Sequence, residues 1–305
     1  MSEFREEDYS REFDPGLWKK LIKYMKPHKR RILTLMVVMV GVAAIDAILP
    51  YMNKYAINNF ILEETTSGLG GFAAVYGLLA VVQAINIWIF ISLAGRLETG
   101  LGYDIRDDGF KKLQELSFSY YDKKAVGWLM ARMTSDIRKL GQIISWGIVD
   151  SVWGIPMMGF MMIMMFINNY KLALITIAVL PFMMVISFYF QKKILKASRR
   201  VRKINSKITG SFNEGISGAK TTKTLVREEK NLEEFSRLTG DMKKSSIRAA
   251  ILSSLYLPIV LTVASIGTAM ALTMGGRAVY LRVIDYGTLV LFLSYTIHFF
   301  EPIFQ

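Results

Sequence analysis

The sequence predicts an all-α membrane protein with six transmembrane helices, and three observations lead to that prediction. Hydrophobic residues make up 52% of the 305 residues, which is more than an ordinary soluble domain holds. Six stretches of about 20 residues are almost free of charge, and that length crosses a hydrocarbon core. Lys and Arg gather in alternate connections between these stretches, as membrane topology requires.

Residues 1–31 are polar and precede a membrane domain that we expect to fill residues 32–305. Their second half, DPGLWKKLIKYMKP, predicts a helix that Asp14 can cap and that Pro27 ends. Leu17, Leu21 and Met25 recur every four residues, and lysines surround them. This pattern is typical of a helix that lies in the membrane interface.

Runs almost free of charge predict the six spans in order, and Asp46 interrupts the middle of the first of them. They cover residues 32–55, 72–95, 143–166, 171–191, 249–274 and 286–305, and the two long loops cover 96–142 and 192–248. The N-terminal segment and the two long loops hold 34 of the 38 Lys and Arg residues. Both termini and both loops are therefore predicted to be cytoplasmic, in a multi-pass protein of a bacterial plasma membrane. The same placement explains the net charge of +13 without any binding of nucleic acid.

Both long loops have the pattern of helical hairpins. In the second loop Ile204, Ile208, Phe212 and Ile216 form one apolar stripe. A returning helix is suggested by Leu225, Leu232, Phe235, Leu238 and Met242. The first loop lacks proline and has turn-forming residues only near its middle. We therefore expect the hairpins to extend about 30–40 Å from the bilayer, and their stripes to pack in a bundle or against a second copy.

The two hairpin tips carry residues that suit contact with another protein. Gly215, Ser217, Gly218 and Ala219 allow a sharp bend and a short helix in the second tip. The first tip has the aromatic residues Phe118, Tyr120 and Tyr121. Aromatic residues far from the bilayer favour a docking surface. Ordinary solvated turns are the alternative interpretation.

The sequence contains no convincing catalytic motif. The segment SGAKT at 217–221 lacks the adjacent Gly-Lys of a phosphate-binding loop, and no strand precedes it. Ser217 and Lys220 have the spacing of a serine nucleophile motif, whose companion motifs are missing. The chain has no cysteine, and the methionine-rich run 156–165 is better explained as flexible apolar packing than as a copper relay. No metal site is predicted.

Polar and ionisable side chains inside the predicted spans are candidates for a substrate cavity, because charge in a bilayer is costly and tends to mark function. Interhelical hydrogen bonding is the structural alternative. The candidates are Asp46, Gln83, Asn86, Trp146, Asp150, His298 and Glu301. Prolines in the spans are expected to bend the helices around such a cavity.

With these residues in place, the chain resembles the transmembrane domain of ABC (ATP-binding cassette) transporters of the exporter type, as a six-span half-transporter. The first loop matches the family pattern at Arg106, Leu113, Leu116, Ser117, Tyr120, Tyr121, Asp122, Gly127, Leu129, Arg132 and Asp136. The second loop matches at Glu214, Gly218, Lys223, Leu225, Glu228 and Phe235, and the last span at Gly287, Leu289, Phe292, Tyr295 and Pro302. Each motif is loose, but together they cover nearly the whole chain in order.

The resemblance implies an ATP-driven exporter that works by alternating access, and a domain-swapped homodimer or heterodimer. Its coupling helices, about Tyr120–Val126 and Gly215–Thr222, would dock on an ABC ATPase domain that binds ATP and Mg²⁺. The residues that this implies for coupling are Tyr120, Tyr121, Asp122, Lys123, Gly127, Gly215, Ser217, Gly218, Ala219, Lys220 and Thr221. No Walker motif occurs in the sequence, so the ATPase domain is expected to be separate or removed, and this chain alone is not expected to hydrolyse ATP.

Two other classes of function remain open from the sequence alone. A passive membrane scaffold or receptor could use the hairpins to bind a cytoplasmic partner. An ion-coupled secondary transporter would need paired acidic residues near the midplane, for which Asp46 and Asp150 are the available pair. The sequence does not distinguish small-molecule, lipid and peptide substrates.

Overall fold

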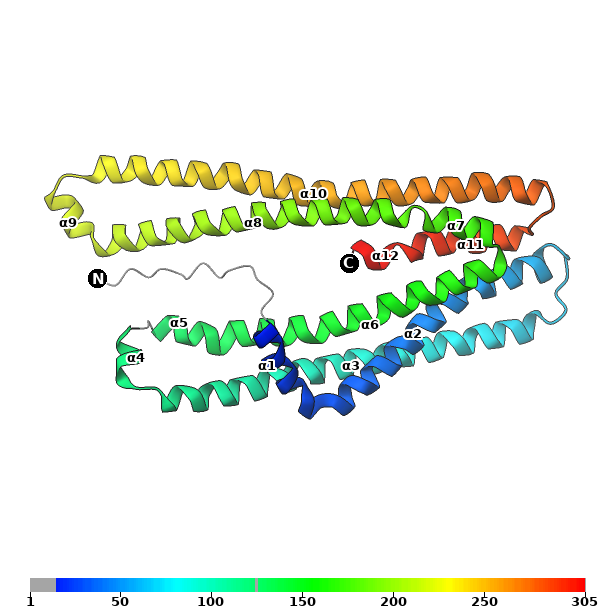
Figure 1. Cartoon of the computed structure of the whole chain (residues 1–305), viewed down its shortest axis with the longest axis horizontal. Coiled ribbons are helices and arrows are strands. Elements are labelled where there is room, and N and C mark those ends of the chain that lie inside the picture. Colours follow the sequence, from blue (N-terminus) through cyan, green and yellow to red (C-terminus); the bar gives the residue numbers. More distant parts are fainter. Residues whose placement is uncertain (1–14, 124–125, 305) are drawn as a thin grey trace. The chain divides into compact units, whose positions relative to one another are not determined.

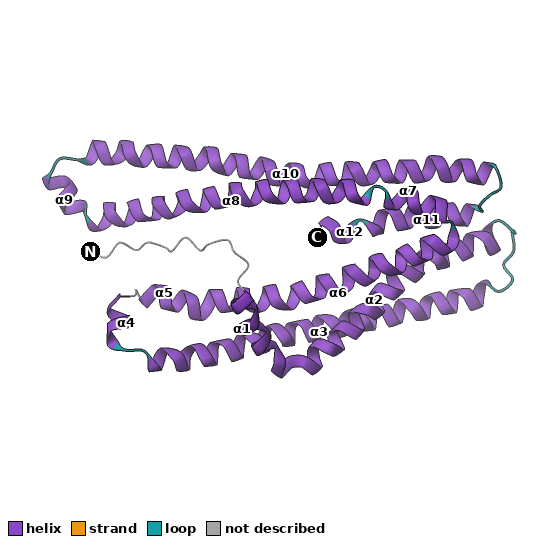
Figure 2. Cartoon of the chain, in the orientation of Figure 1, coloured by secondary structure: helices purple, strands orange, loops and turns teal. Residues whose placement is uncertain are grey.

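A computed structural model describes residues 15–123 and 126–304 of the chain. Across these residues the chain forms helices and short connections, with no strand (Figure 2), so the prediction of an all-α protein is confirmed. The chain divides into two compact units, 1–164 and 165–305.

The first unit begins with a short helix and continues into long ones (Figure 1). Its elements are α1 (Pro15–Met25), a 3-10 turn η1 (Lys26–His28), α2 (Lys29–Ala56), a π-helical turn η2 (Ile57–Ile61), α3 (Leu69–Glu115), α4 (Phe118–Lys123), α5 (Val126–Ala131), a second π-helical segment η3 (Arg132–Asp136) and α6 (Ile137–Asn168). The short helices α4 and α5 lie at one end of the long hairpin, and the connection between α2 and α3 lies at the other (Figure 1).

Apolar residues of α2, α3 and α6 form the core of the first unit. The buried members are Leu35, Met39, Ala94, Leu97, Leu101 and Val149, and Tyr24 and Met25 of α1 pack against them. Gly141 brings α6 against α3, because a Cβ at this position would lie 3.0 Å from the backbone oxygen of Glu98. Through Tyr24 and Met25, helix α1 is attached to the hairpin that follows it.

The second unit holds two very long helices and several short ones. After α6 ends at Asn168, the elements are α7 (Tyr170–Ile177), α8 (Leu180–Ser217), α9 (Ala219–Thr224), α10 (Glu228–Tyr280), α11 (Tyr286–Phe299) and α12 (Glu301–Phe304). Helix α10 packs along α8, α7 and α11. Its 53 residues make a helix about 80 Å long at 1.5 Å per residue.

Two glycines of α10 allow its neighbours to approach closely. A Cβ on Gly275 would lie 2.6 Å from Leu289 Cδ1 of α11, and one on Gly267 would lie 3.2 Å from Val179 Cγ2. Phe292, Tyr295 and Phe299 of α11 are fully buried in the same region. Large side chains on α11 therefore fill the space that the small residues of α10 leave.

Proline follows two of the helix interruptions in the second unit. The helix breaks between Ile177 and Leu180, just before Pro181, and again at Phe300, just before Pro302. Proline lacks the N–H that would continue the helix, and its ring clashes with the preceding turn. Pro50, Pro156 and Pro258 by contrast lie within continuous helices. Pro27 lies in the turn η1 between α1 and α2, where the sequence predicted the first helix to end.

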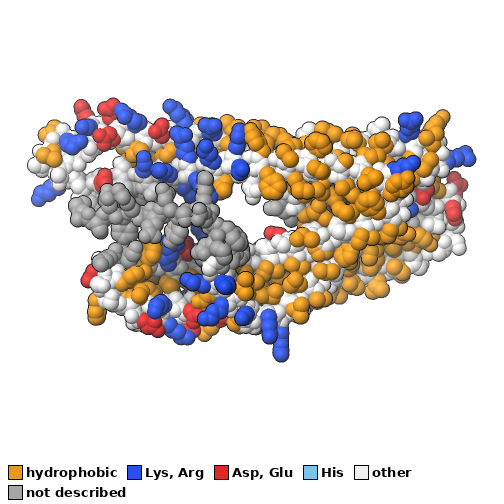
Figure 3. All heavy atoms as spheres, in the orientation of Figure 1, with side chains coloured by type: hydrophobic (Ala, Val, Ile, Leu, Met, Phe, Trp, Pro, Cys, Tyr) orange, Lys and Arg blue, Asp and Glu red, His pale blue; other side chains and the backbone are white. Residues whose placement is uncertain are grey.

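Five helical segments of the described residues are long and apolar enough to cross a membrane. They are Lys19–Ile61, Leu69–Glu115, Val126–Asn168, Tyr170–Ser217 and Glu228–Tyr280. The sixth predicted span begins as expected at Tyr286, but α11 has only 14 residues before the break at Phe300. Figure 3 shows hydrophobic side chains over the part of the second unit near α7 and α11, and Lys and Arg toward α9.

Candidate functional site

The first hairpin tip is formed by α4, which follows a sharp turn at the end of α3. Tyr121 bends back toward α3, because its hydroxyl donates a hydrogen bond to the Leu113 carbonyl oxygen over 2.5 Å. The rings of Tyr120 and Tyr121 lie edge to face, with their centroids 6.0 Å apart. Phe118 is 91% exposed. Tyr121 thus stabilises the tip from within, and Phe118 offers the largest apolar surface for a partner.

The remaining predicted residues of the first tip lie near α4 and α5. Asp122 is exposed on α4, and Gly127 is exposed in α5 with open space around its Cα. The side chain of Lys123 lies outside the described residues. The turn-forming residues in the middle of the first loop are those from Asp122 to Gly127. Helix α3 already ends at Glu115, and a second break separates α4 from α5.

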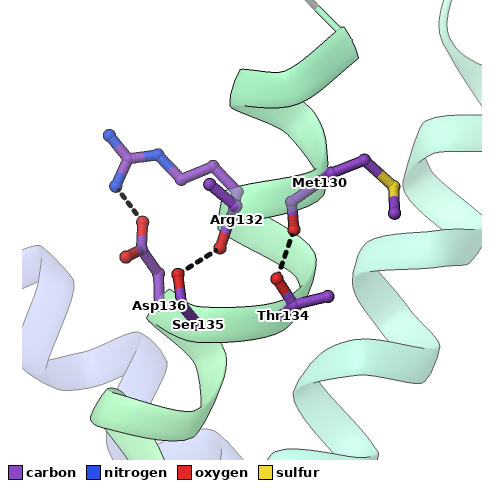
Figure 4. A network of polar contacts seen from close by, with 6 residues as sticks. Met130, Arg132, Thr134, Ser135 and Asp136 are labelled. Atoms are coloured by element: carbon purple, nitrogen blue, oxygen red, sulfur yellow. Dashed lines mark hydrogen bonds and ion pairs between the residues drawn. The ribbon is translucent and has the colours of Figure 1, made fainter.

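Behind α5, the π-helical segment η3 joins the tip to the long helix α6. Figure 4 shows Arg132 paired with Asp136 over 2.5 Å, and the hydroxyl of Thr134 donating to the Met130 carbonyl oxygen. From α3, Arg106 Nε donates to the Met133 carbonyl oxygen over 3.2 Å. The family pattern had included Arg106, Arg132 and Asp136, and their shared position around η3 gives that pattern a structural reason.

Close packing holds η3 against α3. A Cβ on Gly109 would lie 3.1 Å from the Met133 sulfur, so a side chain at this position of α3 would require Met133 to shift. The guanidinium of Arg132 also lies 5.0 Å from the centre of the Trp128 ring. A movement of α4 and α5 would therefore reach α3 and α6 together.

The second hairpin tip bends at Gly218, between α8 and α9. The Gly218 N–H donates to the Glu214 carbonyl oxygen over 2.7 Å, and the Thr222 N–H donates to the Gly218 carbonyl oxygen over 2.8 Å. A Cβ on Gly218 would lie 2.7 Å from the Glu214 oxygen. Glycine suits this junction for a steric reason, since a side chain here would force the last turn of α8 to shift.

The short helix of this tip lies later in the chain than the sequence analysis expected. Gly215 and Ser217 belong to the last turn of α8, and α9 runs from Ala219 to Thr224. Lys220 and Thr221 lie within α9 and are exposed, as is Ala219. The bend needs only Gly218, because the helical hydrogen bonding of α8 continues past Gly215.

Three apolar residues that were not among the predicted coupling residues are also exposed at the second tip. Val226 is 83% exposed, Ile216 is 77% exposed and Leu225 is 60% exposed. The expected returning helix is present, but it starts at Glu228, so the assignment of Leu225 to it was wrong. Val226 has a φ of +48°, a left-handed conformation that a β-branched residue rarely adopts. Such backbone strain is concentrated at functional surfaces.

Asp46 stands at the centre of a polar cluster within the first unit. Its Oδ1 accepts a hydrogen bond from Gln83 Nε2 over 2.8 Å, and its Oδ2 accepts one from Trp153 Nε1 over 2.9 Å. These contacts join α2, α3 and α6. The other amide atom of Gln83, Oε1, is buried and accepts no hydrogen bond within the described residues.

The other predicted cavity residues of the first unit are placed separately. Trp146 Nε1 donates to Glu98 Oε2 over 3.2 Å. Asn86 of α3 faces Gly41 of α2, where a Cβ would lie 3.7 Å from Asn86 Nδ2. Asp150 is exposed on α6. The structure therefore groups Asp46 with Gln83, places Trp146 in a second interhelical contact, and leaves Asp150 accessible.

His298 and Glu301 lie together in the second unit, at the break between α11 and α12. His298 Nδ1 and Glu301 Oε2 are 3.6 Å apart, and both side chains are partly exposed. The two residues are three positions apart, which brings them to the same side of a helical turn.

Polar contacts also attach the N-terminal helix to α3. His28 Nε2 and Asp104 Oδ2 lie 2.8 Å apart, and Gly100 leaves room for the imidazole. Burial raises the pKa of the Tyr24 hydroxyl, which precedes the predicted span, and a hydrogen bond to Asp108 acts in the same direction. The helix α1 is thus fixed to α3 by both polar and apolar contacts.

Among the described residues, no group of three or more His, Asp or Glu side chains lies close enough to hold a metal ion. The site residues therefore form two tip surfaces and several polar contacts between helices.

The comparisons with known proteins agree with this architecture. Residues 32–303 match the family model described as the ABC transporter transmembrane region. An uncharacterized ABC transporter ATP-binding protein, YknU of Bacillus subtilis, is 27% identical over 94% of this chain and 49% of its own length. An ATP-dependent lipid A-core flippase of Syntrophus aciditrophicus is 23% identical over 94% of this chain and 48% of its own. A putative multidrug export ATP-binding/permease protein of Bacillus subtilis, YgaD, is 21% identical over 94% and 51%. The chain therefore spans about half the length of the curated relatives it matches.

Proposed function

We propose, because this chain belongs to the family of ABC transporter transmembrane regions, that it forms the substrate pathway of an ATP-driven exporter. The observation that carries the proposal is the construction of the two hairpins. Each ends in a six-residue helix, α4 or α9, which is set between long helices that contain the predicted spans. Such a helix can receive a force from a partner and pass it to both of its neighbours.

The long helices are suited to transmit that force. From the end of the predicted span at Gln191, α8 continues to Ser217, which is about 39 Å of uninterrupted helix. Phe212 and Phe235 join it to α10 close to the tip, with ring centroids 4.8 Å apart. Two packed helices resist bending better than one, so a displacement of α9 would reach the predicted spans.

We propose an ABC ATPase domain as the partner at both tips. Two of the relatives are named as ATP-binding proteins, and each is about twice as long as the part that matches this chain. ATP and Mg²⁺ would be bound by that domain, and this chain would contribute Tyr120, Gly218, Lys220 and their neighbours as the docking surface. Two such chains, as a homodimer or a heterodimer, would enclose a pathway that opens alternately to the two sides of the membrane.

The proposed substrate is an amphiphile. The relatives include proteins named as an ATP-dependent lipid A-core flippase and as a putative multidrug export protein, and a lipid is an amphiphile. Asp150 is accessible on α6 and is the best placed of the predicted cavity residues to contact a cation. Asp46 and Gln83 bond to each other, so their first effect would be on the arrangement of the helices.

We further propose that both hairpin tips face the cytoplasm of a bacterial cell. The chain has no cysteine, so single cysteines can be labelled without a background. In Ser206→Cys the thiol should react in inside-out vesicles only, and in Thr66→Cys it should react in intact cells with the outer wall permeabilised. If Ser206→Cys reacted in intact cells and Thr66→Cys only in inside-out vesicles, the tips would lie outside the cell and the proposed orientation would be wrong.

Docking can be tested directly in the complete transporter with its ATPase domain. Thr221→Cys carries a benzophenone label on the exposed side of α9, and Ser206→Cys carries the same label halfway along the hairpin. We expect illumination to link the ATPase domain to the first position and not to the second. If both positions were equally unreactive while transport continued, α9 would not be the docking surface.

A further inference from the structure

Basic side chains of α8 and α10 line a pocket that the proposed transport function does not use. The pocket has a volume of about 410 Å³ and lies wholly within the second unit. Its lining consists of Lys193, Lys196, Ala197, Arg200, Lys244, Ser245, Arg248 and Leu252. Five of these eight residues carry a positive charge.

Small residues on both helices make room for the pocket. Ala197 of α8 and the buried Ser245 of α10 are short, so the long side chains around them surround a space instead of meeting across it. Figure 3 shows that Lys and Arg side chains gather along this part of α8 and α10. The cavity is therefore a product of side-chain size as well as of charge.

The positive charge of the pocket is not neutralised by the described part of the chain. Lys193 donates a hydrogen bond to the Tyr189 hydroxyl over 2.5 Å. Lys196, Arg200, Lys244 and Arg248 form no ion pair with any described residue. The sequence contains no acidic residue from 151 to 213 or from 242 to 284, and Asp241 is the nearest one along α10. Cations gathered without a counter-charge bind anions.

The depth of the pocket fits the phosphate layer of a membrane. The predicted spans end at Gln191 and resume at Ala249, so Lys196 and Lys244 each lie five residues beyond a span, about 8 Å along the helix. The polar headgroup region extends about 5–8 Å beyond the hydrocarbon core on each side. Leu252 lies on the side of the pocket nearest the predicted bilayer, where an acyl chain would begin.

We propose that this pocket binds the phosphate headgroup of an anionic phospholipid from the adjacent leaflet. A basic pocket between transmembrane helices at the cytoplasmic surface is a known form of headgroup site. Lys196, Arg200, Lys244 and Arg248 surround the phosphate, and Leu252 contacts the start of an acyl chain. The proposal rests on the orientation proposed above only for the identity of the leaflet that supplies the lipid.

Native mass spectrometry of the full chain in detergent tests the proposal without ATP or an ATPase domain. The probes are dioctanoyl phosphatidylglycerol, dioctanoyl phosphatidylcholine and inorganic phosphate. We expect phosphatidylglycerol to bind at least about tenfold more tightly than phosphatidylcholine, because each cation at a membrane surface strengthens anion binding about fivefold. Inorganic phosphate should compete only at much higher concentration. If it competed as well as the lipid, the site would serve a soluble anion and the lipid proposal would be wrong.

Two variants with the same net charge identify the pocket as the source of binding. The pocket variant changes Lys196, Arg200, Lys244 and Arg248 to Gln, and the control changes Lys203, Lys207, Lys230 and Lys243 to Gln. The pocket variant should lose the tenfold preference, and the control should stay within twofold of the original protein. Equal losses in the two variants would show diffuse attraction to the whole hairpin and overturn the proposal.

A charge-retaining variant guards against loss of folding. Lys196→Arg, Arg200→Lys, Lys244→Arg and Arg248→Lys together keep the positive charge, and this variant should bind the lipid as the original protein does. A second outcome would also overturn the lipid proposal. If the original protein showed no lipid preference and the pocket variant formed fewer dimers, the pocket would bind acidic groups of a second copy instead. None of these measurements depends on transport. The test of lipid binding therefore remains valid even if the exporter proposal is wrong.

Discussion

Gln83 uses only half of its amide in its contact with Asp46. Its Nε2 donates to Asp46 Oδ1 over 2.8 Å, and its Oε1 is buried without a hydrogen bond among the described residues. The side chain can therefore turn over and accept a hydrogen bond if Asp46 becomes a donor.

This relationship predicts different results for two substitutions of Asp46. In Asp46→Asn the new amide N–H can donate to Gln83 Oε1, so the free energy of unfolding should stay within about 0.5 kcal/mol of the original value. In Asp46→Ala both Gln83 and Trp153 lose their acceptor, which should cost about 1 kcal/mol. Thermal unfolding in detergent measures both changes. Equal destabilisation by the two substitutions would mean that the negative charge is what the cluster requires.

The two glycines of the second tip provide a matched pair. Gly218→Ala places a Cβ 2.7 Å from the Glu214 oxygen, so the junction between α8 and α9 must move. Gly215→Ala meets no atom within 4 Å and lies inside α8, where alanine stabilises a helix by about 1 kcal/mol. In the complete transporter we expect Gly218→Ala to lower transport about tenfold with ATP binding unchanged, and Gly215→Ala to have little effect. Similar transport by both variants would contradict a coupling role for this bend.

Substitutions of Val226 distinguish the effect of backbone strain on stability from the effect of a contact with the ATPase domain. Its φ of +48° disfavours a β-branched residue by about 1–2 kcal/mol, so Val226→Gly and Val226→Asn should raise the unfolding temperature. Both substitutions also remove an exposed apolar side chain, so stimulation of the ATPase by substrate should fall in both. A rise in stability with full stimulation would show that Val226 does not contact the ATPase domain.

Arg106 is predicted to hold the π-helical segment of the first hairpin in place. Arg106→Gln removes the hydrogen bond to the Met133 carbonyl oxygen, so amide hydrogen exchange in residues 132–136 should rise about fivefold, equivalent to about 1 kcal/mol. Arg132→Gln removes an exposed ion pair with Asp136, and such pairs contribute little. Exchange measured by mass spectrometry compares the two variants. A larger rise for Arg132→Gln would mean that its pair with Asp136 and its Trp128 contact are the main restraints.

Much of the fold could be predicted from the sequence, because long apolar runs and helical periodicity are local properties. The hairpins and the helix that starts at Tyr286 follow from such patterns. The short helix near Tyr120 was implied only by the resemblance to the exporter family. Trp153 could not be assigned to Asp46, because the contact joins residues 107 positions apart and depends on how three helices pack. The chain bends at Gly218 and not at Gly215, because only Gly218 lies so close to the Glu214 oxygen that a Cβ would clash. Both residues are glycines, so the sequence alone could not distinguish them. Leu225 was misplaced because its spacing fits the next helix equally well.

The uninterrupted course of α10 sets a limit on sequence change in this part of the chain. Each residue advances a helix by about 100°, since 3.6 residues complete a turn. One inserted or deleted residue near Met242 would therefore rotate Gly267 and Gly275 away from α7 and α11 and leave bulky side chains in their place. We expect related chains to vary in length between Leu281 and Asp285 or beside α9, and to keep a constant number of residues from Glu228 to Tyr280.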